Sequence, residues 1–258
     1  LREHEVRVVC LDAPRDGTDP SWLHVVPPAP TGTTAADLAA FARGRPLHWD
    51  RRTAPLLDEV RRHLSSWDPD VVHVVGGQVP GVPALANPRP VVVSALDAAH
   101  RNIAARANVA TGARRLGLRV QTRFVRRWVA TEYTAATAVV LVTQEDAAEV
   151  QRVAPDSNVR VVPNGVDADR FHPGAASARD PGTITFHGVM RYAPNVDAAL
   201  WAADEILPAV RARVPDATLL LVGRSPHPEV AALAERPGIR VTGGVDDIAP
   251  WLARTSVY

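Results

Sequence analysis

The sequence has 258 residues, 46% of them hydrophobic and 22% charged, which is typical of a soluble globular protein with one or two domains. All 29 basic residues are arginines, and with 28 acidic residues the net charge is +1, so no overall charge attracts the chain to nucleic acid. Because lysine is absent and Cys10 is the single cysteine, the composition excludes a P-loop lysine, a Schiff-base lysine, a disulfide framework and a multi-cysteine zinc site.

The chain carries no sign of a membrane-spanning helix or a secretory signal. No apolar run approaches the roughly 20 residues that a membrane span needs, and the N-terminus lacks the charged head, apolar run and cleavage site of a signal peptide. We therefore expect a cytoplasmic protein. Since the sequence begins at Leu1 rather than at methionine and stops at Tyr258 in what looks like a further strand, we also expect a fragment.

Short, valine-rich apolar runs recur along the chain. Most are continuous rather than alternating, which is typical of strands buried on both faces of a parallel sheet. These runs predict strands at 6–11, 22–26, 71–75, 91–95, 138–142, 159–162, 183–187, 218–222 and 239–242.

Helical patterns lie between these runs. They predict helices at 54–66, within an arginine-rich region at about 97–134, and at 145–153, 196–214 and 246–253. The proline- and alanine-rich segment 27–44 reads as a surface excursion with one short helix. Strand alternating with helix over this length predicts a doubly wound α/β architecture.

The best internal boundary is the proline- and glycine-rich segment 163–182, which includes the weakly structured run 175–180. A strand–helix alternation precedes this segment and another restarts after it. We therefore predict one domain at about 1–165 and a second at about 176–258.

Three successive strands after the boundary end at glycine. They run into Gly188, Gly223 and the pair Gly243-Gly244. In open parallel sheets ligands bind at the carboxyl ends of the strands, where glycine lets backbone approach the ligand and helix N-termini favour anions. Each glycine alone could simply make a tight turn, but three in succession favour a nucleotide or phosphorylated ligand. The spacing after Gly188 is not the dinucleotide fingerprint, so NAD is not favoured.

Several motifs then follow one another in the order seen in a known family. The run Val-Val-Pro-Asn-Gly-Val-Asp at 161–167, followed by Arg-Phe-His-Pro at 170–173, resembles the interdomain segment of family 4 glycosyltransferases. The run Phe-His-Gly-Val-Met-Arg-Tyr-Ala-Pro-Asn-Val-Asp-Ala at 186–198 resembles the start of their nucleotide-sugar domain. The closest form is that of sugar transferases in bacterial exopolysaccharide and exosortase-associated clusters. Shorter matches lie at 69–74, 142–146, 206–208, 215–217, 221–224 and 241–247.

This resemblance implies a GT-B fold, in which two Rossmann-like, doubly wound parallel-sheet domains face each other across a cleft, the second being incomplete here. It implies a retaining glycosyltransferase of the hexosyltransferase type that moves a sugar from a nucleotide sugar to a polysaccharide, glycolipid or small-molecule acceptor. It implies no metal and no cofactor besides the nucleotide-diphosphate sugar as co-substrate. The family's paired glutamates should fall beyond Tyr258 and its glycine-rich loop before Leu1, so we expect the isolated chain to be inactive.

The resemblance also assigns the donor-binding residues. It places Gly188 beside the donor diphosphate, and it places around the base and ribose Gly223, Arg224, Thr242, Gly243 and Val245. Many family members grip phosphate with an arginine after the first glycine and a lysine further on. Here these positions hold Val189 and the dipeptide Pro194-Asn195, so Arg191 could supply the charge or could face solvent. Arg224 could likewise be a solvated arginine after a strand.

The first domain offers Asp97 and His100 as candidate catalytic residues, because family members often place a histidine near this strand end. Leu96 occupies roughly that histidine position. Asp97 could contact the acceptor or, as we favour, cap the helix that follows. A lone histidine in a first helical turn, such as His100, is usually solvated.

Three other residues or motifs have a structural explanation that we favour. Asp246 reads as the N-cap of the helix that begins at Asp247, and His73 as a packed histidine within a strand. The motif Asp68-Pro69-Asp70 matches a metal-binding Asp-x-Asp, but it precedes its strand and reads better as a turn. Since the histidines have no ligand-like spacing, we predict no metal.

Residues 101–128 form a basic amphipathic stretch. Eight arginines lie between Arg101 and Arg127, and apolar residues recur at helical spacing at Leu116, Val120, Phe124, Trp128 and Val129. One interpretation is contact with an anionic membrane at its inner face, or with a lipid-linked acceptor. The other, which we favour, is a core-packed helix with a solvated basic face. No aromatic stacking platform points to nucleic acid.

Two other functions remain open. A degenerate member that only binds a nucleotide or partner is favoured by Val189 and by the missing phosphate lysine. A nucleotide-sugar 2-epimerase of the same architecture fits less well, because the Pro-Asn-Gly-Val-Asp segment matches the transferases.

Overall fold

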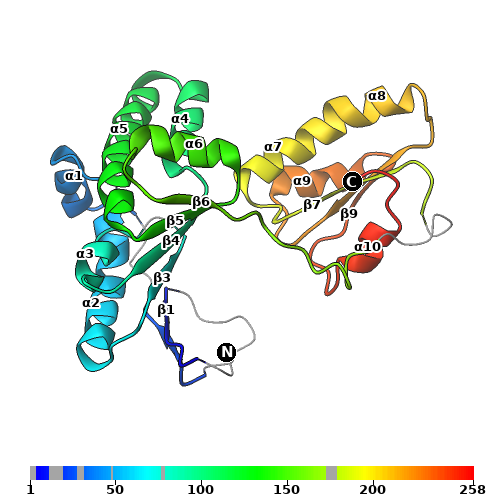
Figure 1. Ribbon diagram of the computed structural model, residues 1–258. Helices are drawn as coiled ribbons and strands as arrows, with labels where there is room; N and C mark the ends of the chain where they lie inside the picture. Colours follow the sequence, from blue (N-terminus) through cyan, green and yellow to red (C-terminus); the bar gives the residue numbers. More distant parts are fainter. Residues whose placement is uncertain (1–3, 12–19, 28–31, 48, 77–78, 173–178) are drawn as a thin grey trace. The chain divides into compact units, whose positions relative to one another are not determined.

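The computed structural model describes residues 4–11, 20–27, 32–47, 49–76, 79–172 and 179–258. The chain divides into two compact units, Leu1–Asn164 (unit 1) and Gly165–Tyr258 (unit 2), and each is built around a parallel sheet (Figure 1). The run predicted as weakly structured at 175–180 lies mostly outside the described residues.

Unit 1 contains a four-stranded parallel sheet and a separate parallel strand pair. The four strands follow one another across the sheet in chain order. They are β3 (Val72–Val75), β4 (Val91–Leu96), β5 (Ala138–Leu141) and β6 (Val159–Val161). The pair consists of β1 (Val8–Cys10) and β2 (Leu23–Val25).

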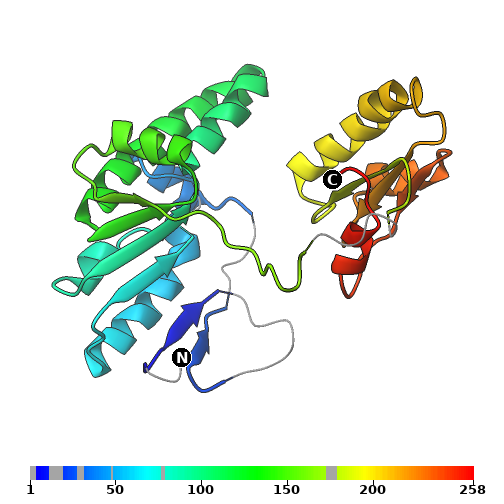
Figure 2. The same ribbon diagram turned by 45° about the vertical axis from the view of Figure 1, so that its right-hand side comes forward.

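Two helices of unit 1 begin at a threonine whose side chain caps the first turn. Thr34 forms a capping box with Asp37, and Thr143 accepts a hydrogen bond from the Asp146 amide. The helices are α1 (Ala35–Ala42), α2 (Trp49–Ser66), α3 (Val82–Ala86), α4 (Ala99–Val109), α5 (Gly112–Ala135) and α6 (Gln144–Val153). The predicted region 97–134 is thus two helices, which pack against each other and extend past the sheet in both views (Figures 1 and 2).

The core of unit 1 lies on one face of its four-stranded sheet. Because the strands are in chain order and crossovers are right-handed, the connecting helices fall on the same face. Accordingly, Val91, Val93 and Ala95 of β4 are buried whereas Val92 and Ser94 are half-buried. The predicted burial on both faces therefore does not hold for β4.

Unit 2 has a three-stranded parallel sheet, again in chain order. The strands are β7 (Thr183–His187), β8 (Thr218–Val222) and β9 (Ile239–Val241), and Val257 forms a parallel bridge to Ile184. The helices are α7 (Ala193–Trp201), which continues through a π-turn η2 (Ala202–Ile206) into α8 (Leu207–Arg211), then α9 (Pro228–Ala232), η3 (Leu233–Glu235) and α10 (Ala249–Ala253). Here Leu219–Val222 of β8 are all buried, as predicted for a strand covered on both faces.

A strand lies at each of the nine predicted apolar runs, and all three sheets of the described residues are parallel, so the predicted α/β class is confirmed. The prediction missed α3 and α9. Both are five residues long, too short for a helical period to show.

Candidate functional site

The carboxyl ends of β7, β8 and β9 meet at one edge of the unit 2 sheet, where backbone hydrogen bonds tie them together. The Gly188 amide donates to Val222 O at 3.1 Å, and the Gly223 amide donates to Gly243 O at 3.0 Å. The Met190 amide donates to Arg224 O, also at 3.1 Å. The structure therefore brings Gly188, Gly223 and Gly243 together, as the sequence predicts for strands of one parallel sheet.

Close approach of backbone at Gly223, and of a side chain at Gly188, explains why glycine occupies two of these strand ends. A Cβ on Gly223 would lie 1.8 Å from Gly188 O, which no side chain can tolerate without backbone movement. A Cβ on Gly188 would lie 2.6 Å from Asn195 Nδ2. Asn195 in turn donates that amide to Val189 O at 3.1 Å, so its side chain is held over the loop that follows β7.

The loop after β9 completes this edge. Thr242 donates its hydroxyl to Gly243 O at 2.8 Å, and Gly243 has φ +71°, the left-handed region that glycine adopts without strain. Val245 is half-buried beyond it. The sharp bend at Gly243 turns the chain away from the sheet and leaves backbone groups at its edge.

Two arginines give this edge its positive charge. Arg191 lies in the loop between β7 and α7, and Arg224 directly follows Gly223; both side chains are exposed. Within the described ranges neither side chain forms an ion pair or a hydrogen bond. A guanidinium group with free donors suits a phosphate or carboxylate.

The sequence analysis missed a histidine at the same edge. His187, the last residue of β7, has its Nδ1 2.7 Å from the hydroxyl of Tyr258, and both side chains are exposed. The signal that could have drawn attention to His187 is its position directly before Gly188.

In unit 1 the corresponding edge carries the candidate catalytic residues. Leu96, at the end of β4, has φ +68°, and the pairing with β5 shifts register between Ser94 and Leu96. A leucine in this backbone region is strained, and such strain concentrates at functional sites. Leu96 is 46% exposed, so burial of its side chain does not explain the strain.

Asp97 follows this bend and has a perturbed carboxyl group. Partial burial raises the pKa of Asp97 above its ordinary value; a hydrogen bond with Asn102 opposes the rise and the charge of Asp146 adds to it. The prediction that Asp97 caps the next helix is wrong: the N-cap of α4 is Ala98, and no side chain caps it. For Asp97 to be the N-cap, α4 would have to begin at Ala98, but it begins one residue later, at Ala99.

His100 was predicted to be solvated, but it is buried. Only 4% of the residue is exposed, and neither ring nitrogen has a hydrogen-bond partner among the described residues. Burial and the charges of Arg126 and Arg152 lower the pKa of His100, against a smaller opposing effect of Glu149 and Asp146. The imidazole lies near charges on α5 and α6, and its catalytic role stays a prediction.

Three structural assignments can now be compared with the sequence. α10 begins at Ala249, so the carboxylate that accepts from its first amide, at 3.1 Å, belongs to Asp247 and not to Asp246. His73 is exposed rather than packed, with its Nε2 2.8 Å from Ser94 Oγ. Asp68 lies after α2 and pairs with Arg89 at 2.6 Å, in agreement with a structural role.

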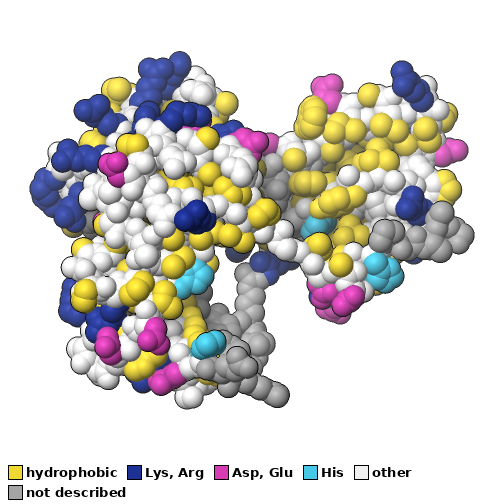
Figure 3. Space-filling model, viewed as in Figure 1, with side chains coloured by type: hydrophobic (Ala, Val, Ile, Leu, Met, Phe, Trp, Pro, Cys, Tyr) yellow, Lys and Arg dark blue, Asp and Glu magenta, His cyan; other side chains and the backbone are white. Residues whose placement is uncertain are grey.

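The basic stretch 101–128 forms an exposed arginine surface on unit 1. Of its eight arginines, Arg101 pairs with Asp146, and the other seven form no ion pair among the described residues. An open pocket of about 930 Å³ is lined by Arg43, Arg45, Arg119, Arg123, Arg126 and Arg127. Dark blue side chains gather over α1, α4 and α5 in Figure 3.

The apolar face predicted for this stretch is wrong in its first half. The buried residues of α5 are Val125, Val129 and Tyr133, whereas Leu116 is 66% exposed. The first part of α5 extends beyond the sheet, so its apolar residues have no core to pack against. None of the helices within the described ranges has the length and hydropathy required to cross a bilayer.

One group of side chains in the described residues has the composition of a metal site. His24, Glu59 and His63 place three ligand atoms within 4.8 Å of one another. The sequence analysis missed this group because His24 lies on a different element from the other two.

Comparison with known proteins identifies two family models along the chain. Residues 2–170 match the model described as Glycosyltransferase Family 4, and residues 181–258 match the model described as Glycosyl transferases group 1. The comparison with curated proteins finds no match.

Solved structures show a similar fold. A crystal structure of Anabaena Alr3699/HepE in complex with UDP and glucose has 16% identity and a TM-score of 0.52, over 90% of this chain and 59% of that chain. A crystal structure of TarM has 12% identity and a TM-score of 0.53, over 77% of this chain and 38% of that chain. The chain thus spans less than two thirds of either protein. At these identities the likeness concerns the fold, and it confirms the predicted GT-B class with Rossmann-like parallel sheets.

Proposed function

The chain belongs to glycosyltransferase family 4, and from this premise we propose that it takes part in transferring a sugar from a nucleotide-sugar donor to an acceptor. The observation that carries the proposal is the edge of unit 2 where Gly188, Gly223 and Gly243 meet. Three strand ends without side chains leave room for backbone to approach a diphosphate, and Arg191 and Arg224 supply positive charge beside them.

The chemistry expected at this edge is stabilisation of the departing nucleoside diphosphate. Its negative charge grows as the sugar leaves, so positioned backbone amides and guanidinium groups would favour the transition state. In our proposal Asn195, Thr242 and Val245 shape the site. We propose retention of anomeric configuration and no metal requirement for the transfer.

We propose UDP as the nucleotide to test first, because the similar structure of Anabaena Alr3699/HepE was solved with UDP and glucose. Calorimetric titration of the 258-residue chain with UDP, GDP and ADP would measure the preference. We expect Arg224→Ala to weaken nucleotide binding about tenfold, since a charge-assisted hydrogen bond contributes roughly 1.5 kcal/mol or more.

The matched control is Arg213→Ala. Arg213 is also an exposed arginine of unit 2, but it follows α8 and lies toward the amino ends of the strands. Equal weakening by both substitutions, or no binding of any nucleotide, would contradict the proposed donor site. Nucleotide binding without sugar transfer in an extended form of the protein would instead favour a non-catalytic binding role.

On the acceptor side we propose that Asp97 and His100 act near the reacting sugar. Asp97 lies at the end of β4, where the residue is open to solvent but its carboxyl group is partly buried, and its raised pKa favours a role in proton transfer. In a form of the protein that transfers sugar, Asp97→Asn should lower kcat and remove the acidic limb of its pH profile. An unchanged profile would exclude Asp97 from the chemistry.

We also propose that the arginine surface contacts an anionic membrane or a lipid-linked acceptor. This proposal is supported by seven exposed arginines without ion pairs in the described part of the chain and by exposed apolar side chains such as Leu116. Arg119→Glu should reduce sedimentation with phosphatidylglycerol vesicles, whereas Arg213→Glu, with the same change of charge in unit 2, should not. Absence of salt-sensitive binding to these vesicles would remove this proposal.

A further inference from the structure

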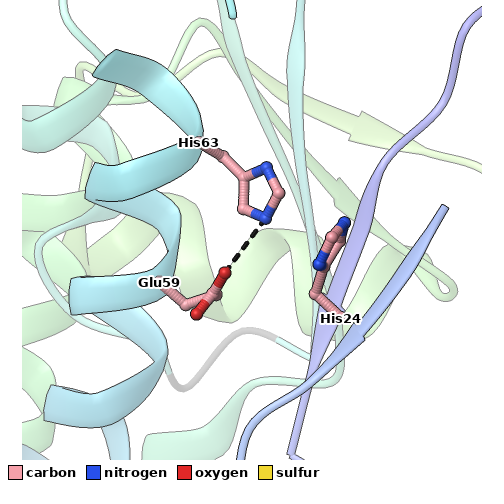
Figure 4. Close-up of side chains that lie close together, drawn as sticks. All are labelled: His24, Glu59 and His63. Carbon is pink, nitrogen blue, oxygen red and sulfur yellow. Dashed lines mark ion pairs between the residues drawn. The ribbon is translucent and has the colours of Figure 1, made fainter. Parts of the chain in front are cut away.

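A compact group of ligand-type side chains joins the β1–β2 pair to α2 within unit 1. Glu59 and His63 are four residues apart on α2 and therefore point to the same side of the helix, toward His24 of β2 (Figure 4). Glu59 Oε1 lies 3.1 Å from His63 Nε2, and the rings of His24 and His63 are 4.2 Å apart between centroids.

These distances fit a small divalent ion. Zinc binds histidine nitrogen and carboxylate oxygen at about 2.0–2.2 Å in tetrahedral geometry, which places neighbouring ligand atoms roughly 3.3–3.5 Å apart. The three ligand atoms already lie within 4.8 Å of one another. Small side-chain rotations would bring them to those separations, and water could fill the fourth position.

The surroundings favour an ion over a simple packed cluster. The side chains of Glu59 and His63 are only 13% and 15% exposed, and among the described residues their 3.1 Å contact does not have hydrogen-bond geometry at His63 Nε2. A buried nitrogen without an aligned partner is costly, and a metal ion that accepts its lone pair would remove that cost.

The second carboxylate oxygen is already engaged in a supporting contact. Arg62 forms an ion pair with Glu59 Oε2, which leaves Oε1 directed at His63. Contacts of this kind commonly orient metal ligands. Arg7 opposes binding, since its charge also reaches His63, but its guanidinium is engaged by Glu5 and lies over the Trp67 ring.

From this geometry we infer that His24, Glu59 and His63 form a zinc site that ties the β1–β2 pair to α2. Two histidines and one glutamate match a zinc donor set with one open position. The ion has a structural role here: β1 and β2 have three residues each, so one coordinated ion adds a strong link to a small element. This differs from the sequence prediction of no metal, which considered only spacing along the chain.

The test uses the tag-free 258-residue chain after removal of metal with a chelator. Titration with Co²⁺ should give the visible absorption of a four-coordinate site with one equivalent bound, and Zn²⁺ should displace it. His24→Gln and His63→Gln should each weaken Zn²⁺ binding on the order of 100-fold, because loss of a ligand should cost at least as much as loss of an outer-shell partner.

The matched control is His227→Gln. His227 also lies beside a carboxylate, Glu229, at 3.2 Å, but the described residues place no third ligand with this exposed pair. Its replacement should leave Zn²⁺ affinity unchanged. Circular dichroism checks that each variant is folded, and His24→Gln provides the decisive measurement if His63→Gln unfolds, because His24 is outside the packed helix.

A second readout is thermal stability. Zn²⁺ should raise the Tm of the original chain and of His227→Gln, and should leave the Tm of His24→Gln unchanged, since a ligand stabilises only the form that binds it. No stoichiometric binding by the original chain, or equal affinity in the His24→Gln variant, would overturn the zinc site. Neither outcome affects the proposed donor site, which is formed by other residues.

Discussion

The carboxyl edges of the two parallel sheets carry the candidate residues in both units, but they are built differently. In unit 2 the edge consists of backbone: Gly188, Gly223 and Gly243 are joined by hydrogen bonds, and close approach excludes a side chain at Gly223. In unit 1 the edge consists of side chains, with Leu96 and Asp97 at the end of β4 and His100 buried behind them.

One bend occurs at both edges with different residues. Gly243 has φ +71° and Leu96 has φ +68°, so the same left-handed backbone is occupied by glycine in unit 2 and by leucine in unit 1. Glycine accepts this conformation freely, whereas leucine stores strain. The unit 2 edge is therefore relaxed and shaped to admit a ligand, and the unit 1 edge holds a strained turn that positions Asp97.

The largest expected effect comes from adding one methyl group to the unit 2 edge. Gly223→Ala would place Cβ 1.8 Å from Gly188 O, so backbone must shift and the link between β7 and β8 must weaken. We expect unit 2 to lose about 3 kcal/mol of stability. Urea unfolding followed by circular dichroism and calorimetry would measure the loss.

Gly117→Ala is the matched control, because Gly117 lies within α5 and a Cβ there would meet nothing within 4 Å. It should stabilise unit 1 by about 0.5–1 kcal/mol through helix propensity alone. If both alanine variants changed stability equally, the close packing of the unit 2 edge would be refuted.

The second effect concerns the buried imidazole of unit 1. His100→Leu has similar volume and removes two nitrogens that have no hydrogen-bond partner in the described residues. We expect a gain of about 1–2 kcal/mol at neutral pH, the cost of an unsatisfied buried polar group. Urea unfolding at about pH 7.5 tests this, and a loss of stability would mean that His100 has a partner in solution.

The same substitution predicts a pH dependence. Burial lowers the pKa of His100 in the folded chain below 6.5, the ordinary value that it keeps in the unfolded chain. At a pH between the folded and the unfolded pKa, the unfolded chain therefore binds more protons than the folded chain. The original chain therefore keeps its full stability above about pH 6.5 and loses stability as the pH falls toward the lowered pKa of His100. The advantage of His100→Leu should grow between about pH 7 and about pH 5. A constant difference would show that the pKa is not lowered.

The contrast between the edges also explains what could be predicted from the sequence. Glycine after a strand is a local signal, so Gly188, Gly223 and Gly243 could be grouped from the chain alone. The burial of His100 depends on how α5 and α6 pack, and the bend at Leu96 on how β4 pairs with β5; no residue pattern near these positions encodes either.

The sequence also failed to predict where two helices begin and which side chains of different elements come together. Ala98 rather than Asp97 precedes α4, and α10 begins at Ala249 rather than near Asp246, because one residue of shift moves a side chain out of capping reach. His24 meets Glu59 and His63 only through the packing of β2 on α2, and sequence spacing carries no trace of it.

The third effect tests the relaxed bend. Gly243→Ala meets no atom within 4 Å, so its cost is the left-handed backbone alone, about 1 kcal/mol. Urea unfolding of unit 2 should show this loss, and it should be clearly smaller than the loss in Gly223→Ala. A loss as large as that of Gly223→Ala would mean that the loop after β9 is packed more tightly than its geometry indicates.

The smallest effect tests the strained bend. Leu96→Gly removes the strain of a left-handed leucine, which costs about 1–2 kcal/mol of stability. Glycine loses more conformational freedom on folding, which costs about 0.5–1 kcal/mol. The net gain in stability should therefore be about 0.5 kcal/mol. Leu116→Gly, the same change at an exposed helical leucine, should instead destabilise by about 1 kcal/mol. Opposite signs in urea unfolding would establish the strain, and because the freed backbone holds Asp97 less firmly, the stabilised variant should position that carboxylate less well.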